Sequence, residues 1–424
     1  MEKIYISPFN FNGIILYHEM KRKGMKIEGF LESNSYLWNK SYAGVGIYQR
    51  GYIPNSRVIV CANETNTIMA IRNHLLEIGY EDNKIEQLDC PVDILNVFDD
   101  ILIDDLLNIY PKTNNVLMDW IEDVKKLKKM EEENIDVRKI SYENLFGLNR
   151  KEIFDGKIFL NKYEIIVTNK CSLKCKKCAA GIQYFEHPQN IEYSQVIKDY
   201  NRMIELIDWT DRIVIIGGEP FLYNDLDKVI DGIFDNPETK KKVGAIKIIT
   251  NGTVIPNNKV LQAIKKNKII IWISNYGDKS RKLGELINIL RQEKIDYTVL
   301  PLQKWSDVIQ LNNEKTIQED EKRLKRRKDG CVTRCRTVAG GRFYLCSLLK
   351  SMDFLGIEPF GSGDYVDLYE DDARTKIMRM LDMNTPLPRA CSFCSGCSKA
   401  DWDDASIKVA EQVSKPLDFI KKRD

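Results

Sequence analysis

Residues 164–178 read EIIVTNKCSLKCKKC, an apolar run that leads directly into three cysteines. The run is short and rich in β-branched residues, which predicts a buried strand that ends near Thr168. The three thiols, Cys171, Cys175 and Cys178, then share one loop at the carboxyl end of this strand. Clustered cysteines in a large chain are more typical of metal or catalytic sites than of disulfides. The sequence therefore predicts a metal site at this strand end.

The number of thiols indicates which metal group they hold. A [4Fe-4S] cluster held by three thiolates keeps one iron without a protein ligand, and that iron can coordinate a substrate or cofactor. Structural zinc normally takes four ligands, and the nearest histidine, His187, lies nine residues after Cys178. The spacing favours an open iron–sulfur site, with zinc as the alternative.

Apolar runs alternate with amphipathic helical stretches after the cysteine loop. Further strands are expected at residues 212–216, 245–249, 269–273 and 297–300. Repeated βα units imply a parallel sheet, open or curled into a barrel, with ligands at the carboxyl ends of its strands. The strand ends carry Gly217, Gly218, Glu219 and Pro220, then Thr250 and Asn251, then Ser274 and Asn275. The glycines allow a ligand to approach closely and the carboxylate can accept from an ammonium, although the other polar residues could be helix caps.

The C-x3-C-x2-C spacing after a strand, followed one βα unit later by Gly-Gly-Glu-Pro, resembles the radical S-adenosylmethionine (SAM) superfamily over about residues 160–305. The resemblance implies a partial (β/α)6 TIM-like barrel over residues 156–310, with a [4Fe-4S] cluster on Cys171, Cys175 and Cys178 whose open iron binds SAM. Reductive cleavage of SAM would then give a 5′-deoxyadenosyl radical that abstracts hydrogen from the substrate.

The same resemblance implies which residues contact SAM. Residues 217–220 would lie at its methionine amino group, and the polar residues that end the next two strands would bind its ribose and carboxylate. Lys177 stands where the family commonly has an aromatic residue near the adenine. Tyr184 or Phe185 is therefore expected to supply that packing.

A second group of cysteines follows the predicted barrel: Cys331, Cys335, Cys346, Cys391, Cys394 and Cys397. Nine residues separate Cys331 from Gly341, and four separate Gly341 from Cys346, a pattern similar to the opening of the SPASM and twitch extensions, which carry auxiliary iron–sulfur clusters. A hairpin turn at Gly340 and Gly341 would bring Cys331 and Cys346 together. One auxiliary [4Fe-4S] cluster is therefore expected within residues 311–400. Its expected ligands are Cys331, Cys346, Cys391 and either Cys394 or Cys397. Cys335 has no assigned role, and a four-thiolate zinc site is the alternative.

Residues 1–91 alternate strands and helices in a parallel α/β pattern. The pattern resembles the Rossmann-like domains of polysaccharide-biosynthesis proteins. A dinucleotide fold would show G-x-G-x-x-G after its first strand, but residues 7–13 keep one glycine, which disfavours NAD. A nucleotide-sugar or carrier ligand and an interaction surface both stay open. A helical linker layer over residues 92–155 and a C-terminal helix over residues 401–424 complete the expected organisation.

Composition excludes some classes of protein. A chain of 424 residues exceeds what one hydrophobic core supports, so several domains are expected. No apolar run is long enough for a membrane span and the first residues do not resemble an export signal, which predicts a cytoplasmic protein without a membrane partner. A net charge of +2 gives no field that favours nucleic acid.

These features predict a radical SAM enzyme of oxidoreductase or isomerase type. The front domain indicates a sugar, a nucleotide-sugar or a related small or carrier-linked metabolite as substrate, with flavodoxin or ferredoxin as reductant. The alternatives are a maturase that modifies a ribosomally made peptide, and a non-catalytic iron–sulfur or zinc protein, against which the Gly-Gly-Glu-Pro motif argues. The sequence assigns no catalytic acid or base, and Tyr276 is expected to pack rather than to donate.

Overall fold

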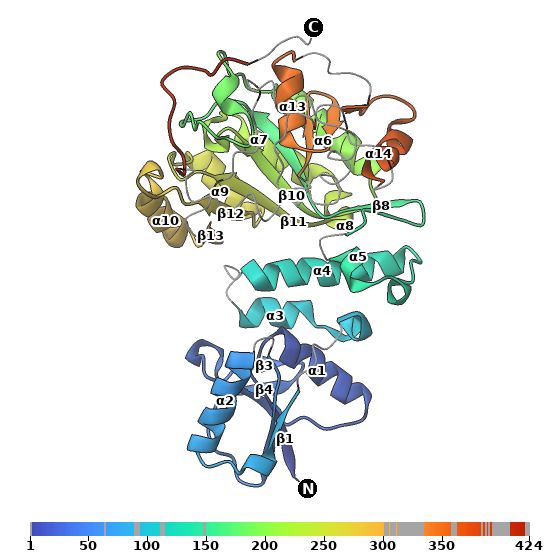
Figure 1. Ribbon diagram of the computed structural model, residues 1–424, viewed down its shortest axis with the longest axis vertical. Helices are drawn as coiled ribbons and strands as arrows, with labels where there is room; N and C mark the ends of the chain where they lie inside the picture. Colours follow the sequence, from blue (N-terminus) through green and yellow to red (C-terminus); the bar gives the residue numbers. More distant parts are fainter. Residues whose placement is uncertain are drawn as a thin grey trace. The chain divides into compact units, whose positions relative to one another are not determined.

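The computed structural model describes residues 2–62, 65–88, 94–110, 115–146, 150–300, 305, 311, 335–357, 363–382, 385, 388, 391 and 408–419. The chain forms two compact units, Met1–Tyr142 and Glu143–Asp424, and each holds a β-sheet with helices packed on it (Figure 1). In the described part of the chain, no helix is long and apolar enough to cross a membrane. The domain boundaries expected at residues 91, 155, 310 and 400 stay predictions.

The first unit is built on a six-stranded sheet in the order β3-β4-β2-β1-β5-β6. Its strands are β1 (Lys3–Ser7), β2 (Gly29–Glu32), β3 (Ser41–Tyr42), β4 (Val45–Gln49), β5 (Ser56–Val60) and β6 (Ile85–Gln87). Neighbouring strands are parallel except for the antiparallel β3–β4 pair. Because β2 lies on one side of β1 and β5 on the other, the sheet grows outward in both directions from β1. In open α/β sheets, ligands bind at such a switch point, beyond the carboxyl ends of the strands.

Among its described residues, the first unit has four helices of seven or more residues: α1 (Phe11–Arg22), α2 (Thr65–Glu77), α3 (Ile103–Ile109) and α4 (Asn115–Glu132). The Asn10 side chain begins α1 by accepting from the Gly13 N–H at 2.9 Å. A Cβ on Gly13 would lie 2.4 Å from the carbonyl oxygen of Pro8. Gly13, the one glycine of residues 7–13, therefore lets α1 pack against the preceding loop.

The second unit is built on a ten-stranded sheet whose main path runs β13-β12-β11-β10-β9-β14-β15-β16. The strands are β7 (Ile153–Phe154), β8 (Lys157–Leu160), β9 (Tyr163–Thr168), β10 (Trp209–Gly217), β11 (Val243–Thr250), β12 (Ile270–Ser274), β13 (Tyr297–Leu300), β14 (Arg336–Ala339), β15 (Arg342–Tyr344) and β16 (Val366–Asp367). Strands β9 to β13 pair in parallel, and β14 adds a parallel neighbour to β9. The predicted parallel α/β fold is confirmed, since the expected strands lie in β9 to β13.

Helices follow the strands of this sheet: α6 (Tyr193–Leu206), α7 (Leu226–Asp235), α8 (Thr239–Lys242), α9 (Asn258–Lys266) and α10 (Leu283–Gln292). One apolar face of the sheet packs on them, with Ile165, Ile215 and Ile271 in a single core. Short α5 (Tyr142–Leu145) lies before this unit's sheet, and α13 (Ser347–Phe354) and α14 (Ala373–Leu381) come later in the chain. Because β9 to β13 run parallel, their five carboxyl ends lie at one edge of the sheet.

The helix expected over residues 401–424 is wrong in its described part, because residues 408–419 contain no helix. Ala410 has a positive φ of 51°, which a continuous helix does not allow. Pro416 lacks the N–H that a helix interior needs. The segment instead forms a β-bridge between Gln412 and Cys175. The backbone hydrogen bonds of this tail thus go to another part of the unit.

Candidate active site

The first cysteine loop follows β9 and holds its three thiols in one small cluster. Cys171, Cys175 and Cys178 pack together with Leu173 and Ala410. Among the residues that the structure describes, no three His, Cys, Asp or Glu side chains converge on a single metal ion. A [4Fe-4S] cluster does not require such convergence, because each thiolate binds a different iron.

The three thiols of the loop all have raised pKa values, so each is harder to ionise than a free cysteine. Burial raises the pKa of Cys171 to about 12 and that of Cys175 to about 11, and it also raises the pKa of Cys178. Backbone N–H groups of residues 180–182 partly oppose this shift at Cys178. A thiol that coordinates a metal cation loses its proton outright. The closely placed thiols, of which Cys175 is buried and Cys171 and Cys178 are partly buried, therefore fit a cationic iron–sulfur group, which would offset the cost of ionising them.

The tail of residues 408–419 covers one side of this loop, a contact that the sequence did not predict. The Gln412 amide donates to the Cys175 Sγ at 3.2 Å, and its oxygen accepts from the Lys174 N–H at 2.7 Å. Two backbone bonds flank it, from Lys176 to Glu411 at 2.7 Å and from Val413 to Lys174 at 2.8 Å. The tail thus pairs with the loop along its length and adds a donor to one thiol.

The Gly-Gly-Glu-Pro segment at the end of β10 fits against the start of the cysteine loop. The Gly218 N–H donates to the Thr168 carbonyl at 2.9 Å, and the Glu219 N–H donates to the Lys170 carbonyl at 2.8 Å. A Cβ on Gly218 would lie 2.3 Å from the Lys170 oxygen. A Cβ on Gly217 would lie 2.4 Å from the Thr168 oxygen. Both glycines are thus required by this close backbone approach.

The Glu219 carboxylate joins the ends of β10 and β11. It is fully buried and accepts from the Thr250 hydroxyl at 2.8 Å, the Asn251 N–H at 2.8 Å and the Phe221 N–H at 3.1 Å. Pro220 begins the short 3₁₀ helix that Glu219 caps. Burial raises the pKa of Glu219 to about 7, against the effect of its three donors. These donors leave one of the four or so acceptor positions of a carboxylate for a ligand cation.

Asn251 links β11 to the cysteine loop. Its amide nitrogen lies 3.5 Å from the Cys171 Sγ and 3.4 Å from the Ser172 Oγ. Its amide oxygen accepts from the N–H and hydroxyl of Thr253, at 3.0 and 2.5 Å. The hydroxyls of Thr253 and Ser172 are hydrogen-bonded to each other. The structure therefore brings Asn251 to the first thiol, together with Ser172 and Thr253, which sequence reasoning missed, whereas Thr250 binds Glu219.

Ser274 and Asn275 lie at the end of β12, where Asn275 takes a local bond. Its side chain accepts from the Gly277 N–H at 2.9 Å, which is the capping role that the sequence had left open. The Ser280 hydroxyl donates to the Asn251 carbonyl at 2.7 Å and lies 3.2 Å from the Ser274 carbonyl. Tyr276 packs beside the three thiols. Ser280 thus joins the ends of β11 and β12.

The aromatic side chains proposed for the adenine are enclosed by protein. Tyr184 and Phe185 are 3% and 8% exposed. The Tyr184 ring lies edge-on to Phe419 at 6.1 Å between centroids. The Phe185 ring lies under the Lys350 ammonium, 5.6 Å from its centroid. Both rings pack in the protein, so little of either face is open to a ligand.

Helix α13 reaches the cysteine loop through a buried lysine that the sequence gave no reason to single out. The Lys350 ammonium donates to the Asn169 side chain at 2.7 Å, and the Ser351 hydroxyl donates to the Ala180 carbonyl at 2.5 Å. Burial lowers the pKa of Lys350 to about 8, and the nearby Cys178 opposes this shift. A cation thus lies beside the thiols in the interior.

The second cysteine group is described in part. Cys346 and Cys391 pack against the same apolar core, whereas Cys331, Cys394 and Cys397 lie outside the described residues. The expected hairpin is present, since β14 and β15 pair with Ala339 opposite Arg342. Cys335 lies before β14, where Lys162 and Glu164 hydrogen-bond to its thiol and burial raises its pKa to about 12. This contact holds the Cys335 thiol against Lys162 and Glu164, at the start of β9.

Comparison with known proteins identifies one domain. The model of the Radical SAM superfamily matches residues 165–276. A probable GTP 3′,8-cyclase of Methanococcus maripaludis is 29% identical over 96 residues, which are 23% of this chain and 30% of that protein. The GTP 3′,8-cyclase of Clostridium botulinum is 23% identical over 296 residues, covering 61% of this chain and 84% of that protein. The chain thus spans less than a third of the first of these relatives.

Solved structures resemble the chain more distantly. The crystal structure of BtrN with AdoMet and 2-DOIA has a TM-score of 0.34 at 16% identity and covers 62% of this chain and 100% of its own. Streptococcus suis SuiB bound to S-adenosylmethionine has a TM-score of 0.28 at 15% identity, over 55% of this chain and 43% of its own.

Proposed function

We propose that the chain, an enzyme with a radical SAM domain on residues 165–276, abstracts hydrogen from a sugar, a nucleotide or a related small metabolite. Its cofactors are a [4Fe-4S] cluster and SAM. When bound, the cluster supplies the electron that cleaves SAM, and SAM supplies the radical that removes the hydrogen. The observation that carries the proposal is the link from the three closely placed thiols to the ends of β10 and β11, since Asn251 donates to Cys171 through its side chain and to Glu219 through its backbone N–H. As an enzyme, the chain is not the non-catalytic metal protein considered from its sequence.

The residues of the site divide into two roles. Cys171, Cys175 and Cys178 would hold the cluster, and the Asn251 amide would donate to one of its thiolates. Glu219 would face the amino group of SAM with its remaining acceptor position. A carboxylate that is costly to ionise alone is stabilised by a nearby ammonium. Ser274 would take a further polar contact with SAM from the end of β12.

The substrate class rests on a separate argument. The two GTP 3′,8-cyclases that the chain resembles are named for a nucleotide substrate, GTP, which contains a ribose. This is consistent with a sugar-bearing metabolite and gives no support to a peptide. We place the reaction in the cytoplasm, with flavodoxin or ferredoxin as the electron donor.

The proposal extends to the remaining parts of the chain. The sheet β9 to β13 would curl into a partial barrel, and residues 311–400 would form a SPASM- or twitch-like extension with one auxiliary [4Fe-4S] cluster. Cys346 and Cys391, which pack on one core, would be two of its ligands. Cys331 and either Cys394 or Cys397 would complete the set. The first unit would be a Rossmann-like domain.

Anaerobic reconstitution tests the function. The chain should bind about eight irons, as two four-iron clusters, and form 5′-deoxyadenosine from SAM and a reductant. Replacing Cys171, Cys175 and Cys178 by Ala should remove about half of the iron and all SAM cleavage. Cys61→Ala is the matched control, because this buried thiol lies in the first unit. Unchanged iron in the triple variant would refute the assignment of the cluster.

A second experiment identifies the substrate class. Deuterated GTP, nucleotide sugars, free sugars and a peptide library would be incubated with the reconstituted enzyme and SAM. Deuterium in the 5′-deoxyadenosine marks the compound that loses hydrogen. Transfer from a sugar or nucleotide supports the proposal, and transfer from peptides alone contradicts it.

A further inference from the structure

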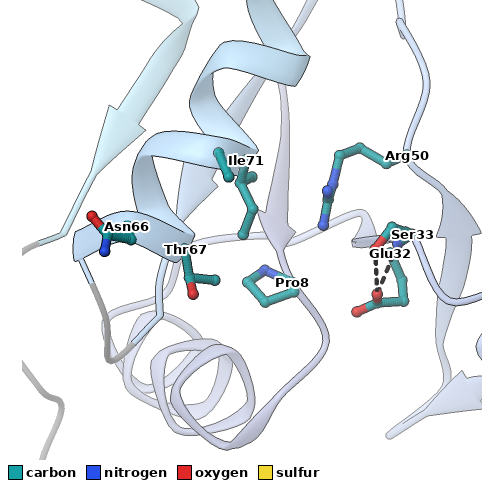
Figure 2. Close-up of a pocket in the computed structure, with 8 residues that line it drawn as sticks. Pro8, Glu32, Ser33, Arg50, Asn66, Thr67 and Ile71 are labelled. Carbon is teal, nitrogen blue, oxygen red and sulfur yellow. Dashed lines mark hydrogen bonds between the residues drawn. The ribbon is translucent and has the colours of Figure 1, made fainter.

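A cavity of about 390 Å³ lies in the first unit (Figure 2). It opens at the carboxyl ends of β1, β2 and β4 and at the first turns of α2. Its lining residues are Pro8, Glu32, Ser33, Arg50, Asn66, Thr67, Ala70 and Ile71. The cavity thus occupies the switch point of the parallel sheet, where an open α/β fold presents side chains to a ligand. Its volume lies within the range of small-molecule sites, about 300–1,000 Å³.

Arg50 follows β4 and directs its guanidinium toward the middle of the cavity (Figure 2). The backbone holds it in place, since the Arg50 N–H donates to the Glu32 carbonyl at 2.9 Å. Its Nε donates to the Ser7 hydroxyl at 3.1 Å, and that hydroxyl donates to the Leu31 carbonyl at 2.8 Å. Among the described residues, no oxygen accepts from either terminal nitrogen of Arg50. A guanidinium anchored at Nε presents this free fork to a planar or tetrahedral anion.

Glu32 ends β2 and lies on the same side of the cavity as Ser33 (Figure 2). One carboxylate oxygen accepts from the N–H groups of Ser33 and Asn34, at 2.7 and 2.9 Å. The other accepts from the Phe9 N–H at 3.0 Å. These bonds fix the carboxylate and keep an acceptor position on the second oxygen, which suits a ligand hydroxyl.

Glu32 and Arg50 carry opposite charges but do not form a direct ion pair. No ion pair within 4.0 Å joins Glu32 and Arg50 among the interactions of the described residues. Burial lowers the pKa of Arg50, and the Glu32 charge opposes that shift. The cation is therefore poorly solvated and gains from a ligand anion. Opposite it, Ala70 and Ile71 of α2 give an apolar wall for carbon atoms of a ligand.

We infer that this cavity binds a small phosphate ester that carries hydroxyl groups, such as a sugar phosphate or a nucleotide. Arg50 holds the phosphate through its terminal nitrogens, and Glu32 accepts from a hydroxyl. The anion is thus held by a side chain that follows β4 instead of by a glycine-rich turn after β1, which this chain lacks. The inference concerns binding in the first unit and is independent of the proposed reaction.

Calorimetry on the reconstituted full chain tests the inference, with uridine monophosphate and glucose 1-phosphate as probes. Uridine, glucose and inorganic phosphate serve as the comparison arms. At least one phosphate ester should bind more tightly than its uncharged counterpart and than phosphate alone. Arg50→Met should weaken that binding about tenfold to a hundredfold, the usual worth of a hydrogen-bonded charge.

Two further variants separate a lost contact from a lost fold. Arg57→Met removes an arginine that pairs with Glu86 on the surface, outside the cavity lining, and should bind like the wild type. Ala70→Leu keeps a good helix former on α2 and narrows the cavity that Ala70 lines, so it should also weaken binding. The inference is overturned if Arg50→Met or Ala70→Leu binds normally, if the uncharged compounds bind equally well, or if no phosphate ester binds at millimolar concentration.

Discussion

Replacing Gly218 by Ala should separate the two strand-end loops that form the candidate active site. The added Cβ would lie 2.3 Å from the Lys170 oxygen, 2.6 Å from the Lys170 carbonyl carbon and 2.8 Å from the Cys171 Cβ. Two of these atoms are backbone, which cannot turn aside as a flexible side chain can. The loops must therefore move apart at the first cysteine.

The cost follows from the contacts that this movement disturbs. The Gly218 N–H to Thr168 and Glu219 N–H to Lys170 bonds, at 2.9 and 2.8 Å, hold the loops together. Each such bond contributes about 1 kcal/mol. Forcing an extra carbon into a packed interior costs about 1–3 kcal/mol more. We expect Gly218→Ala to lower the free energy of unfolding by about 3–5 kcal/mol in total.

Gly284→Ala is the matched control. This glycine lies in α10, and a Cβ there would meet no heavy atom within 4 Å. Alanine in a helix is favoured over glycine by about 0.5–1 kcal/mol, so this variant should be slightly more stable. Urea unfolding followed by tryptophan fluorescence, with iron content after reconstitution, measures both. The reasoning fails if Gly218→Ala unfolds within about 1 kcal/mol of the wild type and keeps its full iron.

Three further predictions concern the buried titratable side chains Glu219, Lys350 and His18. Because burial raises the pKa of Glu219 to about 7, binding of the SAM ammonium should release a proton, and SAM affinity should rise as pH increases through 7. Calorimetry in two buffers of different ionisation enthalpy detects this proton, and its absence would contradict the Glu219 role. Lys350→Met removes an ammonium beside Cys178 and should lower the midpoint potential of the first cluster by tens of millivolts, as followed by electron paramagnetic resonance; an unchanged potential would argue against the effect of this charge. His18 is buried against the Tyr42 hydroxyl at 2.8 Å, and burial lowers its pKa to about 4. Because the unfolded chain binds this proton near pH 6.5, stability should be full above pH 6.5 and fall by up to about 3 kcal/mol as pH drops toward 4. A histidine resonance of His18 that titrates near 6.5 would refute this.

The side chains at the strand ends of the site could be predicted from the sequence, because the order of the strands determines where these ends lie. In a parallel βα array, all carboxyl ends meet at one edge, so cysteines after β9 and a carboxylate after β10 had to come close. The structure joins them through Asn251 and Glu219, both expected at strand ends. Ser172 and Thr253 were missed because single hydroxyls in loops have no distinctive spacing.

The contacts that enclose the loop could not be predicted in the same way. Gln412 lies 237 residues after the thiol that it contacts, and Lys350 lies 181 residues after Asn169. Local patterns carry no information about pairs at such separations. A helix was expected over residues 401–424, whereas the backbone of residues 411–413 pairs with the cysteine loop. Tertiary pairing overrode local propensity there.

These long-range contacts also show that the domain matched by the superfamily model does not complete the site alone. Residues 165–276 supply the three thiols and the strand-end network. The buried ammonium of Lys350 and the amide donor of Gln412 come from later parts of the chain and contact either side of the thiol loop. Each adds positive electrostatic potential where a thiolate-bound cluster adds negative charge. Lys350 and Gln412 are therefore part of the cluster's environment, and the electronic properties of the first cluster should depend on them.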